Sequence, residues 1–219
     1  MNTYTRLLLT AVLSATLFSC SKEMSVEPYR DNTGTTPTPG GNNDHKIYGV
    51  YDFVAMSAAT KSTSSYRESG DLYTNITTSK YTSFNNTGLL TIVPGKCTLS
   101  DLSYAIDTKV ENYSYINGVA DGDMLEMPWQ FNMPKMKSES PFRLVGTDSI
   151  YFEKGLLTPA DNNTTGSVAS EPSGTRYSFS GDTLVMKGQG TKITTNNMQG
   201  MTVTMKSEVT FIVKYRRKK

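Results

Sequence analysis

The sequence predicts an all-β domain, an antiparallel up-and-down meander barrel of about eight to ten strands, with a β-sandwich as the alternative. From Ile47 onward apolar and polar residues alternate with a period of two, and no stretch has an apolar face with helical spacing. Short turns containing Gly and Asp separate these runs, as expected for hairpins. Strands joined in order by short turns favour a closed meander, because closure removes the exposed sheet edges.

The last strand gives the clearest pattern. Between residues 203 and 216, Val, Met, Phe and Tyr occupy alternate positions, and Thr, Lys, Glu and Arg occupy most of the others. This pattern predicts a long antiparallel strand with one buried and one wet face. Residues 196–200 are expected to turn it back against residues 183–195. Shorter alternating runs predict the other strands: residues 49–56, 87–93 and 101–110, and hairpins pairing 142–145 with 149–152 and 177–179 with 184–186.

The domain resembles lipocalin-type barrels over residues 47–217. Its opening Gly49-Val50-Tyr51 is similar to the Gly-x-Trp start of these barrels, with Tyr in place of Trp, and Val213-Lys214-Tyr215-Arg216 is similar to their last strand, where a basic residue packs near that aromatic. The order of elements resembles lipocalin-like lipoproteins of Gram-negative bacteria, through the segments 85–88, 102–107, 126–128 and 146–152. The resemblance implies a barrel that holds a small, largely apolar ligand, which eight strands are about wide enough to enclose.

The first residues have the features of a secretory signal. One basic side chain, Arg6, precedes an uncharged apolar run from Leu7 to Phe18, which is too short to span a bilayer. Leu17-Phe18-Ser19-Cys20 resembles the lipobox of bacterial lipoproteins. This resemblance implies removal of residues 1–19, attachment of diacylglycerol to Cys20 through a thioether, and acylation of its new amine by a fatty acid such as palmitate.

A tether and a membrane location follow from the residues after Cys20. Residues 20–46 are rich in Thr, Pro, Gly and Asn and lack any periodicity, which predicts a flexible linker ahead of a domain at residues 47–219. Ser21 is not the Asp that retains lipoproteins in the inner membrane, so an outer-membrane anchor is expected, on the periplasmic face or the cell surface. A net charge of +2 gives no basic field for nucleic acid, and a monomer is expected.

The sequence offers few groups for catalysis or metal binding. His45 is the only histidine and precedes the domain, and Cys97 is the only cysteine besides Cys20. No catalytic triad, Cys-x-x-Cys pair, two-histidine metal site or phosphate loop is present. We therefore expect no enzymatic activity, no cofactor and no metal, and we expect Cys97 to be a small buried hydrophobe.

The most unusual segment runs from Met124 to Met136, where four Met, one Trp and one Phe are interrupted by Pro128 and Pro134. Met and aromatic residues make adaptable apolar surfaces. The segment is either a ligand-contacting loop or strand, or ordinary core packing with its large residues on one strand face. Under the first interpretation the candidate ligand-binding residues are Tyr51, Tyr104, Trp129, Phe131, Met133 and Phe142.

Two functions are compatible with these features. The first is a membrane-tethered module that binds a small hydrophobic or amphipathic ligand. The second is a structural or accessory lipoprotein that binds a protein or a surface glycan, with its barrel filled by its own side chains. In addition, Ser149 and Thr183 follow Asp and precede an aliphatic residue, a pattern at which some Gram-negative bacteria O-glycosylate exported proteins.

Overall fold

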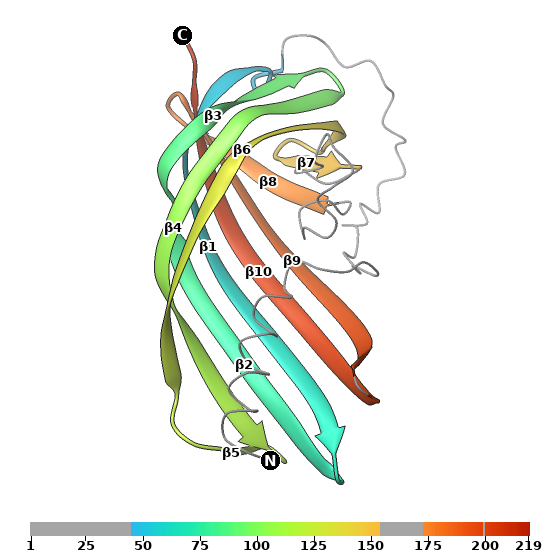
Figure 1. Ribbon diagram of the computed structural model, residues 1–219. Helices are drawn as coiled ribbons and strands as arrows, with labels where there is room; N and C mark the ends of the chain where they lie inside the picture. The colour runs from blue at the N-terminus through green and yellow to red at the C-terminus, as the bar shows by residue number, and fades with distance from the viewer. Residues whose placement is uncertain (1–44, 154–172, 199) are drawn as a thin grey trace.

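The structure is a computed structural model that describes residues 45–153, 173–198 and 200–219 (Figure 1). Cys20 and the predicted tether therefore lie outside the described residues, apart from His45 and Lys46. The described chain forms strands β1 (Gly49–Glu68), β2 (Asp71–Thr82), β3 (Phe84–Val93), β4 (Lys96–Ile116), β5 (Val119–Ala120), β6 (Leu125–Val145), β7 (Ser149–Phe152), β8 (Ser173–Ser180), β9 (Thr183–Met198) and β10 (Met201–Arg217). Within these ranges no helix is long and apolar enough to cross a membrane.

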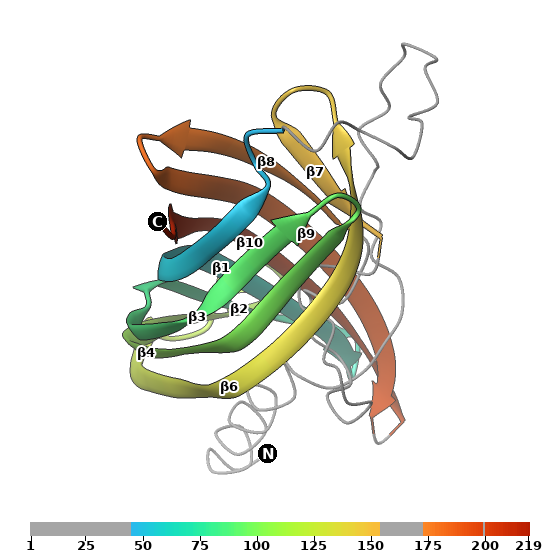
Figure 2. The same ribbon diagram turned by 90° about the horizontal axis from the view of Figure 1, so that it is seen from above.

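The strands close into a ring, which confirms the predicted barrel and excludes the sandwich. Around the ring the order is β1, β3, β4, β6, β7, β8, β9 and β10, and β10 pairs with β1 to complete it (Figure 2). All paired neighbours are antiparallel. Strands β2 and β3 follow one another along the same place between β1 and β4. The second half of β1 pairs with β2, and its first half pairs with β3. The chain is therefore an up-and-down meander.

The predicted hairpins form with the expected partners. Phe142 pairs with Phe152 across the turn at Gly146, and Phe179 pairs with Leu184 across the turn at Gly181. The last strand pairs with β9 from residue 201 to residue 216, as its long alternation predicted. Several strands are longer than the sequence indicated, above all β1, which continues twelve residues past Met56 to Glu68.

The extra length takes six strands beyond the closed ring, in the order β9-β10-β1-β2-β4-β6 (Figure 1). We call this part the extended sheet. Strands β7 and β8 are short and do not reach it, so the lower half of β6 pairs only with β4, among the described residues. Pro128 and Pro134 fit within β6 for this reason, because an edge strand tolerates the missing N–H of proline.

Register irregularities mark the level at which the closed ring becomes the extended sheet. They occur between Phe53 and Ala55 in β1, between Thr87 and Leu89 in β3, and between Leu99 and Leu102 in β4. Bulges of this kind bend a strand and increase its twist. The Met56 amide of β1 donates a hydrogen bond of 2.8 Å to the Oγ of Ser83, the residue between β2 and β3. This bond connects the β2–β3 junction to β1.

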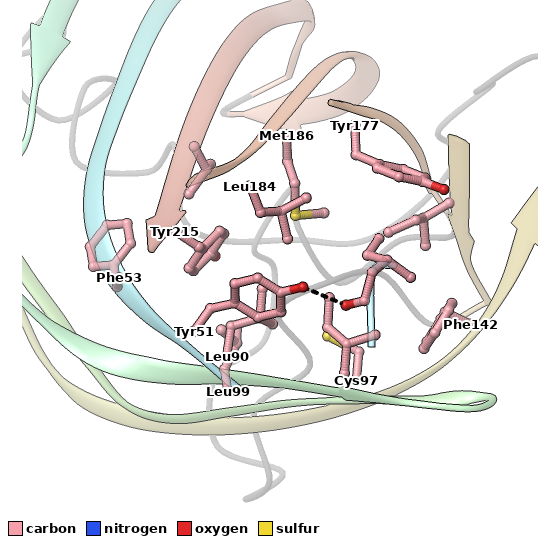
Figure 3. Packing of buried hydrophobic residues seen from close by; sticks show 14 of the residues in the cluster. Tyr51, Phe53, Leu90, Cys97, Leu99, Phe142, Tyr177, Leu184, Met186 and Tyr215 are labelled. Carbon is pink, nitrogen blue, oxygen red and sulfur yellow. Dashed lines mark hydrogen bonds between the residues drawn. The ribbon is translucent and has the colours of Figure 1, made fainter. Parts of the chain in front are cut away.

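The closed end of the barrel is packed with large side chains (Figure 3). Tyr51, Phe152 and Tyr215 are each at most 2% exposed, and Leu90, Leu99, Leu184 and Met186 fill the space between them. Ile47, just before β1, is fully buried against the same cluster. The apolar alternation of the sequence is thus used mainly to build this core.

Tyr51 and Arg217 lock the ends of the domain together. The Tyr51 hydroxyl donates a hydrogen bond of 2.8 Å to the Ile47 carbonyl, shown dashed in Figure 3. The Arg217 guanidinium lies 5.2 Å from the centre of the Tyr51 ring, and its Nη2 donates to the Tyr51 hydroxyl at 2.8 Å. The basic residue on this aromatic is therefore Arg217, whose backbone is the register partner of Tyr51, and not the neighbouring Arg216.

Cys97 is expected to be unreactive in the folded protein. Its thiol is 3% exposed within the core, and burial raises its pKa to about 12. Because the thiolate is the reactive form, a chain starting at Ser21, in which Cys97 is the only thiol, should resist Ellman's reagent at pH 8 and react fully in denaturant. The folded thiol keeps its proton at higher pH than the unfolded one, so its contribution to stability is lost as the pH rises from about 9 toward 12. Rapid reaction without denaturant would contradict this burial.

Candidate functional site

The candidate site lies on the side of the extended sheet that continues the barrel interior, which we call the inner face. Strand alternation and register assign its residues. From β9 through β10, β1, β2 and β4 to β6 they are Gly188, Gly190, Lys192, Thr194, Asn196, Phe211, Val209, Ser207, Met205, Val203, Ala58, Thr60, Ser62, Ser64, Tyr66, Glu68, Tyr81, Ser79, Thr77, Asn75, Tyr73, Asp71, Tyr104, Ile106, Thr108, Val110, Asn112, Ser114, Ile116, Leu125, Met127, Trp129, Phe131 and Met133.

A chain of aromatic rings runs along one side of this face. Tyr104 and Phe131 have ring centres 6.3 Å apart, Trp129 and Phe131 stack at 6.3 Å, and Tyr81 meets Trp129 edge-on at 5.7 Å. These separations are those of favourable aromatic pairs. Phe53 extends the chain into the core, 6.1 Å from Tyr104. The rings of Trp129, Phe131 and Tyr81 are only partly buried, unlike those of the closed end.

The structure separates the six predicted ligand-binding residues into two groups. Tyr104, Trp129, Phe131 and Met133 lie together on the inner face, with Tyr104 and Met133 as register partners. Tyr51 and Phe142 belong to the packed closed end, where Phe142 is 6% exposed and contacts Phe152. The Met-rich segment is a strand with its large side chains on one face, and that face is the half-exposed inner one.

Several inner-face aromatics were not among the predicted ligand-binding residues. Tyr81, next to the end of β2, follows a run of Thr, Ser and Lys that has no apolar alternation, so no pattern marked it. Phe211 was assigned to the apolar side of the last strand, but only the register places it opposite Ala58 and Gly188. Its ring fills the space above Gly188, where an added Cβ would lie 2.4 Å from Phe211 Cζ.

The middle of the inner face is polar and hydrogen-bonded across strands. Thr60 Oγ1 and Ser79 Oγ share a hydrogen bond of 2.7 Å, Asn112 Nδ2 donates to Thr77 Oγ1 at 2.9 Å, and Ser114 Oγ donates to an oxygen of Asn75 at 2.8 Å. Small hydroxyl and amide side chains, with Lys192 as the one charged side chain beside them, therefore line the middle of the described inner face between the aromatic chain and the strand tips. Such a surface suits an uncharged or amphipathic molecule better than a strongly ionic one.

The two tyrosines of the aromatic chain remain neutral well above physiological pH. Burial raises the pKa of Tyr104 to about 12, with a smaller contribution from the nearby Tyr81 phenol, and burial also raises the pKa of Tyr81. Both hydroxyls therefore act as neutral donors and acceptors on this face.

Ser149 and Thr183 stand at hairpin turns, as predicted. Ser149 Oγ donates to an oxygen of Asp148 at 2.9 Å, and Thr183 Oγ1 donates to an oxygen of Asp182 at 3.2 Å, both at exposed positions. Local hydrogen bonds of this kind are common for Asp followed by Ser or Thr in turns. Glycosylation at these hydroxyls stays a prediction.

Comparison with protein families, curated proteins and solved structures found no match to this chain. Among the described residues, no group of three or more His, Cys, Asp or Glu side chains could hold a metal ion.

Proposed function

We propose that the protein is an outer-membrane-anchored lipoprotein whose β-barrel domain binds a small hydrophobic or amphipathic ligand. The observation that carries the proposal is the aromatic chain of Tyr104, Phe131, Trp129 and Tyr81, which is partly exposed on the inner face. Large aromatic side chains on a concave strand surface, next to a few polar groups, are typical of small-molecule sites. The anchor is the acylated Cys20 that the signal sequence predicts.

The packing of the closed end supports a site on the extended sheet. Core side chains such as Tyr51 and Tyr215 occupy the barrel between its walls at that end. Within the described part of the chain, the inner face has no such layer of large apolar residues from the opposite wall, because β7 and β8 end before reaching it. A ligand is therefore proposed to lie against β4, β6 and β10 rather than deep in the ring.

The Tyr51 and Arg217 contact supports the resemblance to lipocalin-type barrels. The resemblance implied that a basic residue near the end of the last strand packs on the aromatic of the opening Gly-x-Trp motif. Arg217 makes this contact with Tyr51, with Gly49 beside the guanidinium. On this proposal the domain uses the architecture of these barrels, with tyrosine performing the packing role of tryptophan.

Trp129 should report ligand binding directly, because it is the only Trp and its ring lies in the aromatic chain. Titration of the chain from Ser21 onward with apolar probes such as 1-anilinonaphthalene-8-sulfonate is expected to change its emission and to saturate. The Trp129→Phe variant should show no Trp emission, but it should still bind the probe and increase the fluorescence of the probe itself. Emission that is constant over all probes would count against the proposal.

A second candidate function is supported by the solid closed end. A structural or accessory lipoprotein that binds a protein or a glycan would need no ligand space, and a barrel filled by residues such as Phe152 and Leu184 fits this role. The titration separates the two candidates, since only the first predicts saturable binding of small apolar molecules.

A further inference from the structure

Lys192 is the charged residue in the middle of the inner face, since the other two charged side chains that register places on this face of the described sheet, Glu68 and Asp71, lie at the turn between β1 and β2. In β9 it alternates with the outward-facing Lys187, Thr191 and Ile193, and its register partner on β10 is Ser207. Ser207 in turn pairs with Ser62 on β1. On the outer face, Lys109 of β4 pairs with Glu126 of β6, and Lys206 pairs with Glu208 within β10.

The Lys192 side chain is largely buried. It is 8% exposed, and no hydrogen bond or ion pair joins its Nζ to any other described residue. Proteins usually satisfy a cation in such a position with an opposite charge or hydrogen bonds. Among the described residues, register places no carboxylate in the inner-face row of Lys192 or in the rows beside it, since Glu68 and Asp71 lie six residues farther along the strands.

Hydroxyl groups surround the position of Lys192. Ser62 and Ser207 lie in its own row of the sheet, and Ser64 lies in the next row. Ser64 is 5% exposed, and its Oγ is buried without a hydrogen-bond partner. A buried hydroxyl that lacks a partner in the described structure is available to donate to an acceptor. One cation with nearby hydroxyl donors is a suitable arrangement for an anionic oxygen group.

The apolar part of the inner face starts four residues away along the strands. The row of Phe211 and Ala58 includes Tyr81 by direct register, and Trp129 lies across Thr108 from Tyr81. Four residues of antiparallel strand span about 13 Å, and neighbouring strands lie about 4.8 Å apart. An alkyl chain of medium length therefore reaches from Lys192 on β9 to Phe211 on the adjacent β10. Tyr81, at the near end of the aromatic chain, lies two strands beyond Phe211 in the same row.

We infer that the ligand is an anionic amphiphile, with a carboxylate or phosphate head group bound by Lys192 and the neighbouring serines, and an alkyl body lying against Phe211 and directed toward the aromatic chain. This inference rests on the proposed function and specifies its ligand class. Val209 and Gly190 lie between head and body, and the rows from Lys192 to Phe211 place no other charged side chain on this face. Neutral amphiphiles of the same length should bind more weakly, because they leave Lys192 without a counter-charge.

The test compares three probes of equal chain length, dodecanoate, dodecyl phosphate and dodecanol, by calorimetry below their micelle concentrations. The protein is the chain from Ser21 to Lys219, which retains every residue of the core cluster, all of which lie between Ile47 and Tyr215. Lys192→Met keeps an unbranched side chain one heavy atom shorter and removes its charge. Lys187→Met, on the same strand but on the exposed outer side, is the matched control.

The anionic probes should bind the unmodified chain about tenfold more tightly than dodecanol, which corresponds to one charge-assisted hydrogen-bonding contact. Lys192→Met should remove this difference and leave dodecanol affinity within about twofold, whereas Lys187→Met should change neither. A preference for one anion over the other would identify the head group. If Lys192→Met does not fold, Lys192→Arg, which keeps the charge, should retain the preference of the unmodified chain.

Equal affinity of dodecanol and the anions for the unmodified chain, or equal effects of the two Met variants, would overturn the inference while leaving ligand binding intact. If none of the three probes binds, the proposed function itself is wrong, and the inference fails with it. The two failures are therefore distinguishable in one set of titrations.

Discussion

Gly88→Ala is expected to lower the free energy of unfolding by about 3–5 kcal/mol, through overpacking combined with backbone strain. Gly88 has a φ of +123° and sits at the irregular level of β3, opposite the bulge of β4. A Cβ there would lie 2.7 Å from the Leu102 Cα and 2.9 Å from its amide nitrogen. Backbone atoms cannot rotate away as a side chain can, so the two strands must separate. Chemical denaturation followed by circular dichroism measures the loss.

Gly70→Ala is the matched control for this prediction. Gly70 also has a positive φ, +94°, at the turn between β1 and β2, but nothing lies within 4 Å of the position of an added Cβ. It should therefore show only the conformational cost, about 1–2 kcal/mol. Equal losses for the two variants would mean that β3 and β4 do not approach as closely at Gly88 as the structure indicates.

Tyr51→Ala is expected to cost about 3–5 kcal/mol, the usual range for removing a large aromatic from a core. The Tyr51 ring is fully buried in the core cluster that includes Leu90 and Leu99, and its hydroxyl joins Ile47 to Arg217. The variant loses the packing of the ring and both hydrogen bonds. Thermal unfolding should therefore begin at a temperature well below that of the unmodified chain.

Tyr51→Phe divides this loss into its two parts. It keeps the ring but leaves the Ile47 carbonyl without the Tyr51 donor, and it removes one of two acceptors of Arg217, which keeps the Lys46 carbonyl. A cost of about 1–3 kcal/mol is expected for this unsatisfied group. A loss as large as that of the Ala variant would show that the hydroxyl, rather than the ring, holds the closed end together.

The sequence predicted the closed end of the barrel well, because two local signals coincide there. Turn residues at Gly146 and Gly181 separate strands that alternate cleanly between apolar and polar side chains, so both the hairpins and their register follow. The second half of β1 has no such signal. Its residues, from Ser57 to Ser65, are Ala, Thr, Lys and Ser on both faces, and only pairing with β2 and β10 makes this segment a strand.

The candidate site was predicted in part, since alternation shows which residues share a face but not their height along the barrel. Tyr51 and Trp129 both point inward, yet one lies in the packed end and the other on the inner face. That difference depends on where β7 and β8 end, which no residue of β1 or β6 specifies. Lys192 had no signal either, because it stands in a polar run and its face follows only from counting along β9.

The first and last strands of the domain are neighbours, and this determines how it responds to a pulling force. Tyr51 pairs with Arg217, and the Lys218 amide donates to the Val50 carbonyl at 2.8 Å, so the chain enters and leaves the ring at the same end. A force that pulls the N-terminal end of β1 away from the C-terminal end of β10 therefore breaks the β1–β10 hydrogen bonds one pair at a time, starting beside Tyr51, rather than all together. A domain held in this way peels open from its packed end, and the Tyr51–Arg217 contact is the first to resist.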